Sequence, residues 1–167
     1  PAALDPARTE MVPALLAERA KRKFRHLGTT ETASRDAEHT MLARALDDPR
    51  FEVIMLAFHL MHQNARRLVF PRTRSQGVGT LLMFVVRNIF SRPEILAATL
   101  KDLAAAGKIP ADVAGDNDPL GFLVHATGAE SLTDAAYRFV RHEQGVDVVL
   151  FGTSSIAHLR SNIASIL

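Results

Sequence analysis

Apolar residues along the chain follow two alternating patterns, short continuous runs and stretches with helical spacing. Both patterns occur at the end of the chain. Residues 146–151 form a nearly continuous apolar run rich in β-branched side chains, which is typical of a strand covered on both faces of a parallel sheet. Gly152 ends the run, Thr153 to Ser155 can cap a helix, and apolar residues recur at helical spacing from Ile156. The pattern predicts a strand, a tight turn and a helix.

The same two patterns predict four strand–helix units over the whole chain. Alternating strands and helices favour right-handed βαβ units and a parallel sheet, hence the α/β class. A complete eightfold barrel needs about 250 residues. A chain of 167 residues therefore suits half of a TIM-type (β/α)8 barrel. The predicted strands are 24–28, 51–61, 78–85 and 146–151, and the predicted helices are 6–23, 33–46, 93–106, 131–143 and a last one from 156.

The segments that connect the predicted strands and helices differ in composition. Residues 62–76 are basic and polar, with a short helix expected around 65–70, and four arginines in this stretch suggest a solvated loop. Residues 107–128 form a long turn-rich passage with one short helical turn expected. Ser131 to Asp134 reads as a capping box that begins the helix before the last strand.

Composition narrows the class of protein. With 47% hydrophobic and 23% charged residues, the chain suits one domain over residues 1–167. A net charge of +2 gives no strong field for nucleic acid or an anionic membrane, and no apolar run approaches the roughly 20 residues of a membrane helix. The absence of cysteine removes disulfides, thiolate catalysis and Cys-ligated zinc. We expect a cytoplasmic protein and, because the sequence begins at Pro1, a piece of a longer chain.

The predicted turn after residue 151 points the free N–H groups of a helix start beyond a strand end, a place that attracts phosphates. The segment from Gly152 to Asn162 resembles the closing motif of the aldo/keto reductases. In that family a Gly ends the last barrel strand, and a Gln, a Leu and an Asn follow on the next helix; His158 stands at the Gln position. The resemblance extends upstream: 25–31 is similar to the fifth strand, 52–61 to the sixth, 77–84 to the seventh, and 131–139 to the helix before the last strand.

The resemblance implies the C-terminal, cofactor-holding part of an oxidoreductase that reduces a small carbonyl substrate with NADP(H). The catalytic Asp, Tyr, Lys and His of the family lie upstream, so no catalytic residue and no metal ligand is expected here. The adenosine phosphate would meet Gly152, Thr153 and Ser154, and the adenine side His158 and Asn162. The nicotinamide end would lie near Thr30, Glu31 and Met83.

Three residues depart from the family pattern. Met55 replaces a Gln that would bind the carboxamide, Met83 replaces an aromatic ring, and Ser154 stands where many members have Arg or Lys. The choice between NADP and NAD therefore stays open. These departures also leave open a second class of function, a non-catalytic scaffold or interaction domain with the same fold.

Simpler interpretations exist for the same residues. The closing turn could be an ordinary serine-capped helix start, and Thr30 and Glu31 an ordinary loop. His59 and His62 have the spacing of a helical metal pair, but they sit at a predicted strand end without an acidic partner. Half a barrel would leave two sheet edges and an apolar inner face open, so we expect the chain to pair with a missing N-terminal half, to form a homo-oligomer or to aggregate.

Overall fold

The computed structural model describes residues 4–126 and 128–167. Four strands form one parallel sheet in the order β1-β2-β3-β4, with each strand beside its neighbour in sequence. The predicted α/β class, the alternation and the parallel pairing are confirmed. The strands are β1 (Gly28–Thr30), β2 (Val53–Ala57), β3 (Gly79–Met83) and β4 (Val148–Val149).

Helices precede, connect and follow these strands. Before β1 come α1 (Leu4–Pro6), the π-helical turn η1 (Ala7–Met11) and α2 (Val12–Ala20). The 3-10 turn η2 (Ala33–Arg35) and α3 (Thr40–Ala45) link β1 to β2, and α4 (Ala65–Leu68) and α5 (Phe70–Gln76) link β2 to β3. Between β3 and β4 lie α6 (Arg87–Ser91), α7 (Pro93–Ala105), α8 (Ala111–Gly115), α9 (Phe122–His125) and α10 (Leu132–Arg141), and α11 (Ile156–Ile166) follows β4.

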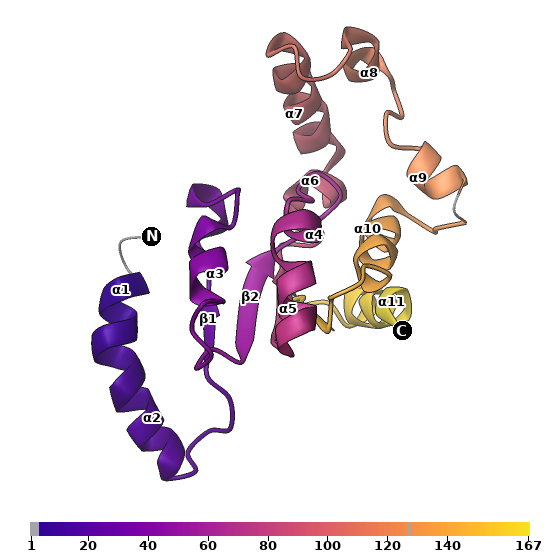
Figure 1. Cartoon of the computed structure of the whole chain (residues 1–167). Helices are drawn as coiled ribbons and strands as arrows, with labels where there is room; N and C mark the ends of the chain where they lie inside the picture. The colour runs from indigo at the N-terminus through magenta and orange to yellow at the C-terminus, as the bar shows by residue number, and fades with distance from the viewer. Residues whose placement is uncertain (1–3, 127) are drawn as a thin grey trace.

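The sheet has one covered face and one open face. Ile54, Leu56 and Leu82 have no exposed surface, because they point toward the side on which α3, α4, α5 and α10 pack (Figure 1). Successive residues of a strand point to opposite faces. Of the alternate residues, which point the other way, Ala57 at the end of β2 is buried, whereas four stay only partly buried: Val53, Met55, Leu81 and Met83.

The closing strand is a correction to the sequence analysis. Only Val148 and Val149 of the run 146–151 pair with β3, and Val148, Leu150 and Phe151 are 43%, 39% and 37% exposed. The expectation of a strand covered on both faces is wrong here: Val149 packs against the main core, whereas Val148 and Leu150 point the other way, to the open face of the sheet. The predicted turn and helix do follow, but the apolar positions of α11 are open as well, with Leu159 at 40% exposure.

The first predicted strand and the second predicted helix are also shifted. Residues 24–27 are irregular, and pairing begins at Gly28, where a Cβ atom would lie 2.9 Å from the Val53 carbonyl oxygen. The helix predicted over 33–46 starts only at Thr40. The Asp36 carboxylate accepts hydrogen bonds from the Thr40 and Met41 N–H groups and so fixes the later start.

The connections hold more helix than the sequence predicts. The basic stretch 62–76 forms α4 and α5, whose arginines bind partners on neighbouring elements, as Arg66 does with Glu143 and Arg72 with Asp47. The passage 107–128 forms α8 and α9, and α6 was not expected. Figure 1 shows α7 and α8 standing away from the sheet, beyond the end to which the β2 arrow points. We call the segment 87–125 the excursion.

Other predictions hold. The Ser131 hydroxyl accepts a hydrogen bond from the Asp134 N–H at 3.1 Å and begins α10 as predicted. Helix α7 spans the residues expected of it within one position. In the described parts of the chain, none of the helices combines the length and apolar character that crossing a bilayer requires.

Candidate functional site

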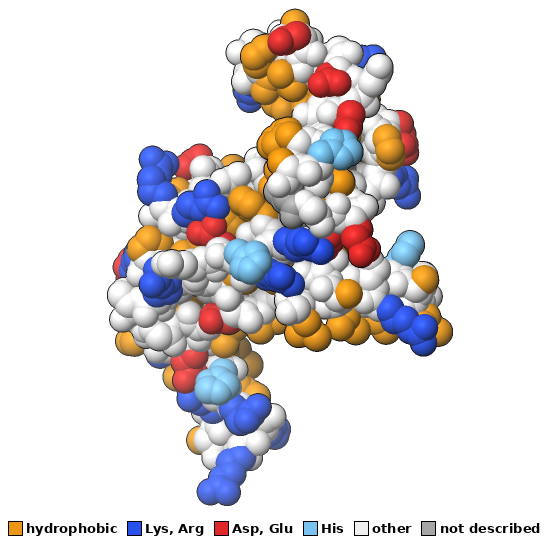
Figure 2. All heavy atoms as spheres, turned by 90° about the vertical axis from the view of Figure 1, so that its right-hand side faces the viewer, with side chains coloured by type: hydrophobic (Ala, Val, Ile, Leu, Met, Phe, Trp, Pro, Cys, Tyr) orange, Lys and Arg blue, Asp and Glu red, His pale blue; other side chains and the backbone are white. Residues whose placement is uncertain are grey.

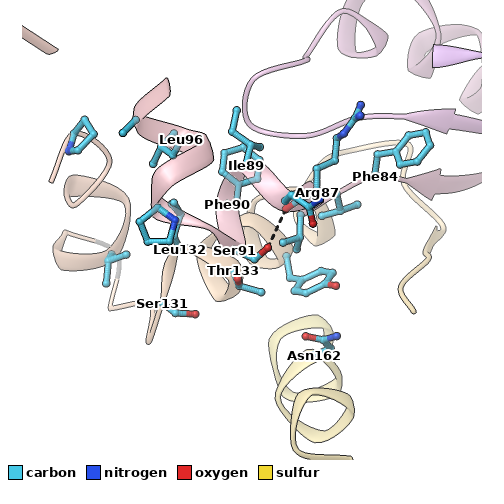
Figure 3. A pocket seen from close by; sticks show the side chains of 18 of the residues that line it. Phe84, Arg87, Ile89, Phe90, Ser91, Leu96, Ser131, Leu132, Thr133 and Asn162 are labelled. Atoms are coloured by element: carbon cyan, nitrogen blue, oxygen red, sulfur yellow. Dashed lines mark hydrogen bonds between the residues drawn. The ribbon is translucent and has the colours of Figure 1, made fainter. Parts of the chain in front are cut away.

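A large cleft lies at the carboxyl ends of β3 and β4. Its volume is about 1070 Å³, and its walls come from the segment after β3, the excursion, α10 and the turn into α11. Phe84 and Arg87 stand on one side and Asn162, on α11, on the other (Figure 3). Ligands of parallel α/β folds bind at the carboxyl ends of strands, and drug-sized ligands fill roughly 300–1000 Å³. This cleft has the position and the room for an extended ligand.

The turn after β4 is built by its own hydroxyl groups. The Ser155 N–H donates to the Thr153 hydroxyl at 3.1 Å, and the His158 N–H donates to the Ser155 hydroxyl at 3.3 Å. The second of these bonds is the N-cap of α11. Capping orients the helix so that His158 and Asn162, one turn apart, share the face that lines the cleft.

Four of the eight predicted cofactor-binding residues meet in this cleft. Gly152 and Thr153 line it from the turn, and His158 and Asn162 line it from α11. The other four do not line it. Ser154 is exposed within the same turn, Thr30 and Glu31 lie at the end of β1, and Met83 ends β3 just before Phe84, the first residue of the cleft wall.

The Glu31 side chain is not accessible to a ligand. Its side chain is fully buried; one carboxylate oxygen accepts a 2.7 Å hydrogen bond from the Ala57 N–H, and the other lies 2.7 Å from His39 Nδ1. His39 precedes α3, with a left-handed backbone at φ 52°, and its fully buried ring stacks 5.0 Å from the His62 ring. The pair ties the ends of β1 and β2 together.

His59 and His62 close a tight turn after β2. Their backbone N–H and carbonyl groups exchange two hydrogen bonds, of 3.1 and 2.8 Å. Burial, together with the nearby charges of His62 and Arg87, lowers the pKa of His59 to about 4, so its ring is neutral at pH 7. Within residues 4–126 and 128–167, no three His, Cys, Asp or Glu side chains are arranged to hold a metal ion.

The sequence analysis missed the wall formed by the segment after β3. Phe84 is 46% exposed with φ 65°, and Arg87 has φ 46°. The guanidinium carbon of Arg87 lies 4.9 Å from the centre of the Phe84 ring. In the sequence, the available signal was an arginine three residues beyond an aromatic residue at a predicted strand end. Tyr137 of α10 adds a phenol to the same cleft, and burial raises its pKa.

In the comparisons with known proteins, no family model and no curated protein matches this chain.

Proposed function

We propose that this chain is the C-terminal, cofactor-binding part of an aldo/keto reductase-like oxidoreductase that uses NADP(H) or NAD(H) to reduce a small carbonyl substrate. One observation carries the proposal. The residues that the family resemblance assigns to the adenosine end of the cofactor, Gly152, Thr153, His158 and Asn162, line a single cleft at the strand ends.

The chemistry of this wall suits the adenosine end of a nucleotide. Leu150 and Phe151 supply apolar surface against which a planar base can pack, and Asn162 and His158 supply hydrogen-bonding groups for its edge. Thr153 and the N–H groups of the capped turn suit a phosphate or ribose oxygen. Nicotinamide cofactors supply the hydride, and this chain would bind and orient them. The proton donor for the carbonyl would come from outside this chain.

Calorimetry on the chain tests the proposal directly. NADPH, NADH and ADP-ribose should each bind at one site, and adenosine more weakly, because the cleft described here holds the adenosine end. Failure of all four to bind, with the fold intact by circular dichroism, would contradict the proposed function.

We further propose that the sheet is half of a TIM-type (β/α)8 barrel. Its strands are parallel and in sequence order, helices cover one face, and the partly buried Val53, Met55 and Leu81 would become the barrel interior. The sheet ends at β1 on one side and at β4 on the other, and unpaired edges recruit further strands.

The placement of the terminal helices favours a missing N-terminal half over a homo-oligomer. In Figure 1, α1 and α2 lie beyond α3 on the β1 side, and α11 lies on the opposite side of the molecule, against α10. A second copy that closed the barrel would bring α11 and α2 to the same junction. The two helices would then compete for the same place. A unit of four strands that begins and ends with a strand would fit beside both edges and bring no additional helix to either junction.

Light scattering on the isolated chain tests this preference. With its apolar face open, the chain should self-associate without a fixed stoichiometry. A stable symmetric dimer would favour the second copy instead. A stable monomer that binds no hydrophobic dye would contradict the open half-barrel.

A non-catalytic, aldo/keto reductase-like scaffold is the second candidate, and one observation favours it. The positions assigned to the nicotinamide end offer little to that ring, since Glu31 is buried and Met83 lies outside the cleft. Hydride transfer distinguishes the two. A protein that contains this chain and binds NADPH without oxidising it in the presence of any carbonyl compound would be the scaffold.

A further inference from the structure

We propose that Arg87, held against the Phe84 ring, binds an anionic group of the ligand: a phosphate of the nucleotide or a carboxylate of the substrate. The inference rests on the proposed function for the identity of the ligand, and on the geometry of these two residues for the site itself.

Arg87 is the one Arg or Lys side chain among the described residues that line the cleft. In the described parts of the chain, no carboxylate lies within ion-pairing distance of its guanidinium. Other arginines of the fold are engaged, such as Arg66 with Glu143 and Arg138 with Asp134. The guanidinium of Arg87 is therefore not neutralised by a carboxylate of the described chain.

The backbone around Arg87 is strained. Phe84 and Arg87 have φ values of 65° and 46°, a left-handed region that is unfavourable for a residue other than glycine. Between them, Val85 is 2% exposed and belongs to the main core, so the loop is anchored in the protein interior. Packing of Val85 thus maintains a conformation that leaves Phe84 and Arg87 exposed.

The Phe84 ring fixes the direction of the guanidinium. A guanidinium carbon 4.9 Å from the ring centre is within cation–π range, and the contact restricts a side chain that would otherwise sample many rotamers. Figure 3 shows the two side chains next to each other on the wall opposite Asn162. The planar guanidinium group, with its paired N–H donors, is then available for two parallel hydrogen bonds to an oxyanion.

The positive charge of Arg87 lies away from the part of the cleft that we assign to the adenosine end of the ligand. Arg87 is close enough to the end of β2 to contribute to the lowered pKa of His59. The acidic groups of the cleft, Asp116 and Asp118, come from the excursion, and Asp118 is paired with His125. An anion of the bound ligand would therefore lie toward the middle of the strand ends, next to Arg87.

Binding measurements on the whole chain test the inference, with ADP-ribose, adenosine and pyruvate as probes. The Arg87→Gln variant should bind ADP-ribose or pyruvate roughly 10- to 100-fold more weakly, since a hydrogen bond to a charged group is lost, and adenosine unchanged. A loss confined to ADP-ribose identifies a phosphate as the anion, and a loss confined to pyruvate identifies a carboxylate. Unchanged affinity for both would overturn the inference.

Arg92→Gln is the matched control. Arg92 is exposed, lies five residues along the chain, has no carboxylate partner among the described residues and does not line the cleft, so its loss should leave all three affinities unchanged. Arg87→Lys should bind between wild type and Arg87→Gln, because it keeps the charge and loses the planar guanidinium group.

Phe84→Gly separates a binding role from a structural one. Glycine adopts a positive φ without strain, so the melting temperature should stay or rise while anion affinity falls. A lower melting temperature with unchanged affinity would contradict the role given to Phe84. If wild type binds pyruvate through Arg87 but neither ADP-ribose nor adenosine, the nucleotide proposal fails and the anion site stands.

Discussion

The two ends of the sheet use their polar residues in opposite ways. At the β1–β2 end, Glu31, His39 and the Ala57 N–H bind one another and are buried. At the β3–β4 end, Arg87 and Asn162 face a cleft of about 1070 Å³. Both groups lie at the carboxyl ends of parallel strands, where sites of such folds occur. Position at a strand end therefore does not by itself leave a polar side chain free: Glu31 and His39 contact each other, whereas Arg87 and Asn162 face the cleft.

The connecting segments explain this difference. After β2 the chain turns back at once through His59 and His62, and the His62 ring stacks on His39 and covers the polar pair. After β3 the excursion of residues 87–125 leaves the sheet and returns only at α10 (Figure 1). The first connection closes its end of the sheet, whereas the second provides walls for a cleft.

The apolar side chains of α11 are more exposed than those around β2. The core residues around β2 are fully buried, whereas Ile156, Leu159 and Ile163 of α11 are 69%, 40% and 41% exposed. Figure 2 faces the side of the molecule on which α9, α10 and α11 lie and shows apolar side chains at its surface. Exposed apolar area of this kind marks an interface.

Glu31→Ala should have the largest effect, and on stability alone. Removing one partner of a buried pair costs about 3–5 kcal/mol, here by leaving His39 and the Ala57 N–H without an acceptor. Urea unfolding measures the loss, and Glu38→Ala, at an exposed glutamate, is the control. If Glu31→Ala instead keeps its stability and loses nucleotide binding, the β1–β2 end belongs to the ligand site after all.

Acid should weaken the same end of the sheet. The pKa of His59 is about 4 in the folded protein against 6.5 as its ordinary value, so the unfolded chain binds more protons between these pH values. Stability is then full above pH 6.5 and falls as pH drops toward 4, by at most about 3 kcal/mol. Urea unfolding of the wild type and of His59→Asn at several pH values in this range measures the loss. The variant should lose less stability than the wild type on acidification. An equal loss of stability in both proteins would contradict the role of His59.

Asn162→Ala should affect binding and spare stability. Its side chain lines the cleft with no hydrogen-bond partner among the described residues, so the free energy of unfolding should change by less than about 0.5 kcal/mol. Nucleotide affinity should fall roughly 10-fold, the equivalent of one hydrogen bond. Arg160→Ala, on the same helix but outside the cleft lining, should change neither quantity.

Ser155→Ala should have the smallest effect. It removes the acceptor for the His158 N–H at the start of α11 and costs about 1 kcal/mol. Hydrogen exchange should show faster exchange in the first turn of α11 and no change in β2. Equal acceleration in both would mean that the β4–α11 end is not the less stable part of the sheet.

Local signals in the sequence predicted much of the fold. The central strands were visible because β2 and β3 are apolar runs, and the starts of α10 and α11 were visible because Ser131 and Ser155 cap them. The four cleft residues found in advance lie in one segment, 152–162, where turn chemistry and helical spacing are both local.

The rest depends on distant contacts. Glu31 binds the N–H of Ala57, 26 residues away, and nothing near Glu31 in the sequence signals that bond. Val148 and Leu150 are exposed because they point to the face of the sheet that the described helices leave open, although the residues of this strand suit a buried one. Arg87 was missed because its φ is set by the packing of Val85 in the core and not by its own propensity.

An NMR titration of the labelled chain with NADPH compares the two ends of the sheet most directly. Backbone amide signals of Phe84, Arg87, Thr153, His158 and Asn162 should shift together and saturate, while those of Glu31, His39 and Ala57 stay in place. Saturable shifts at Glu31 and His39, or no saturable shift at the β3–β4 end, would contradict a nucleotide cleft at that end.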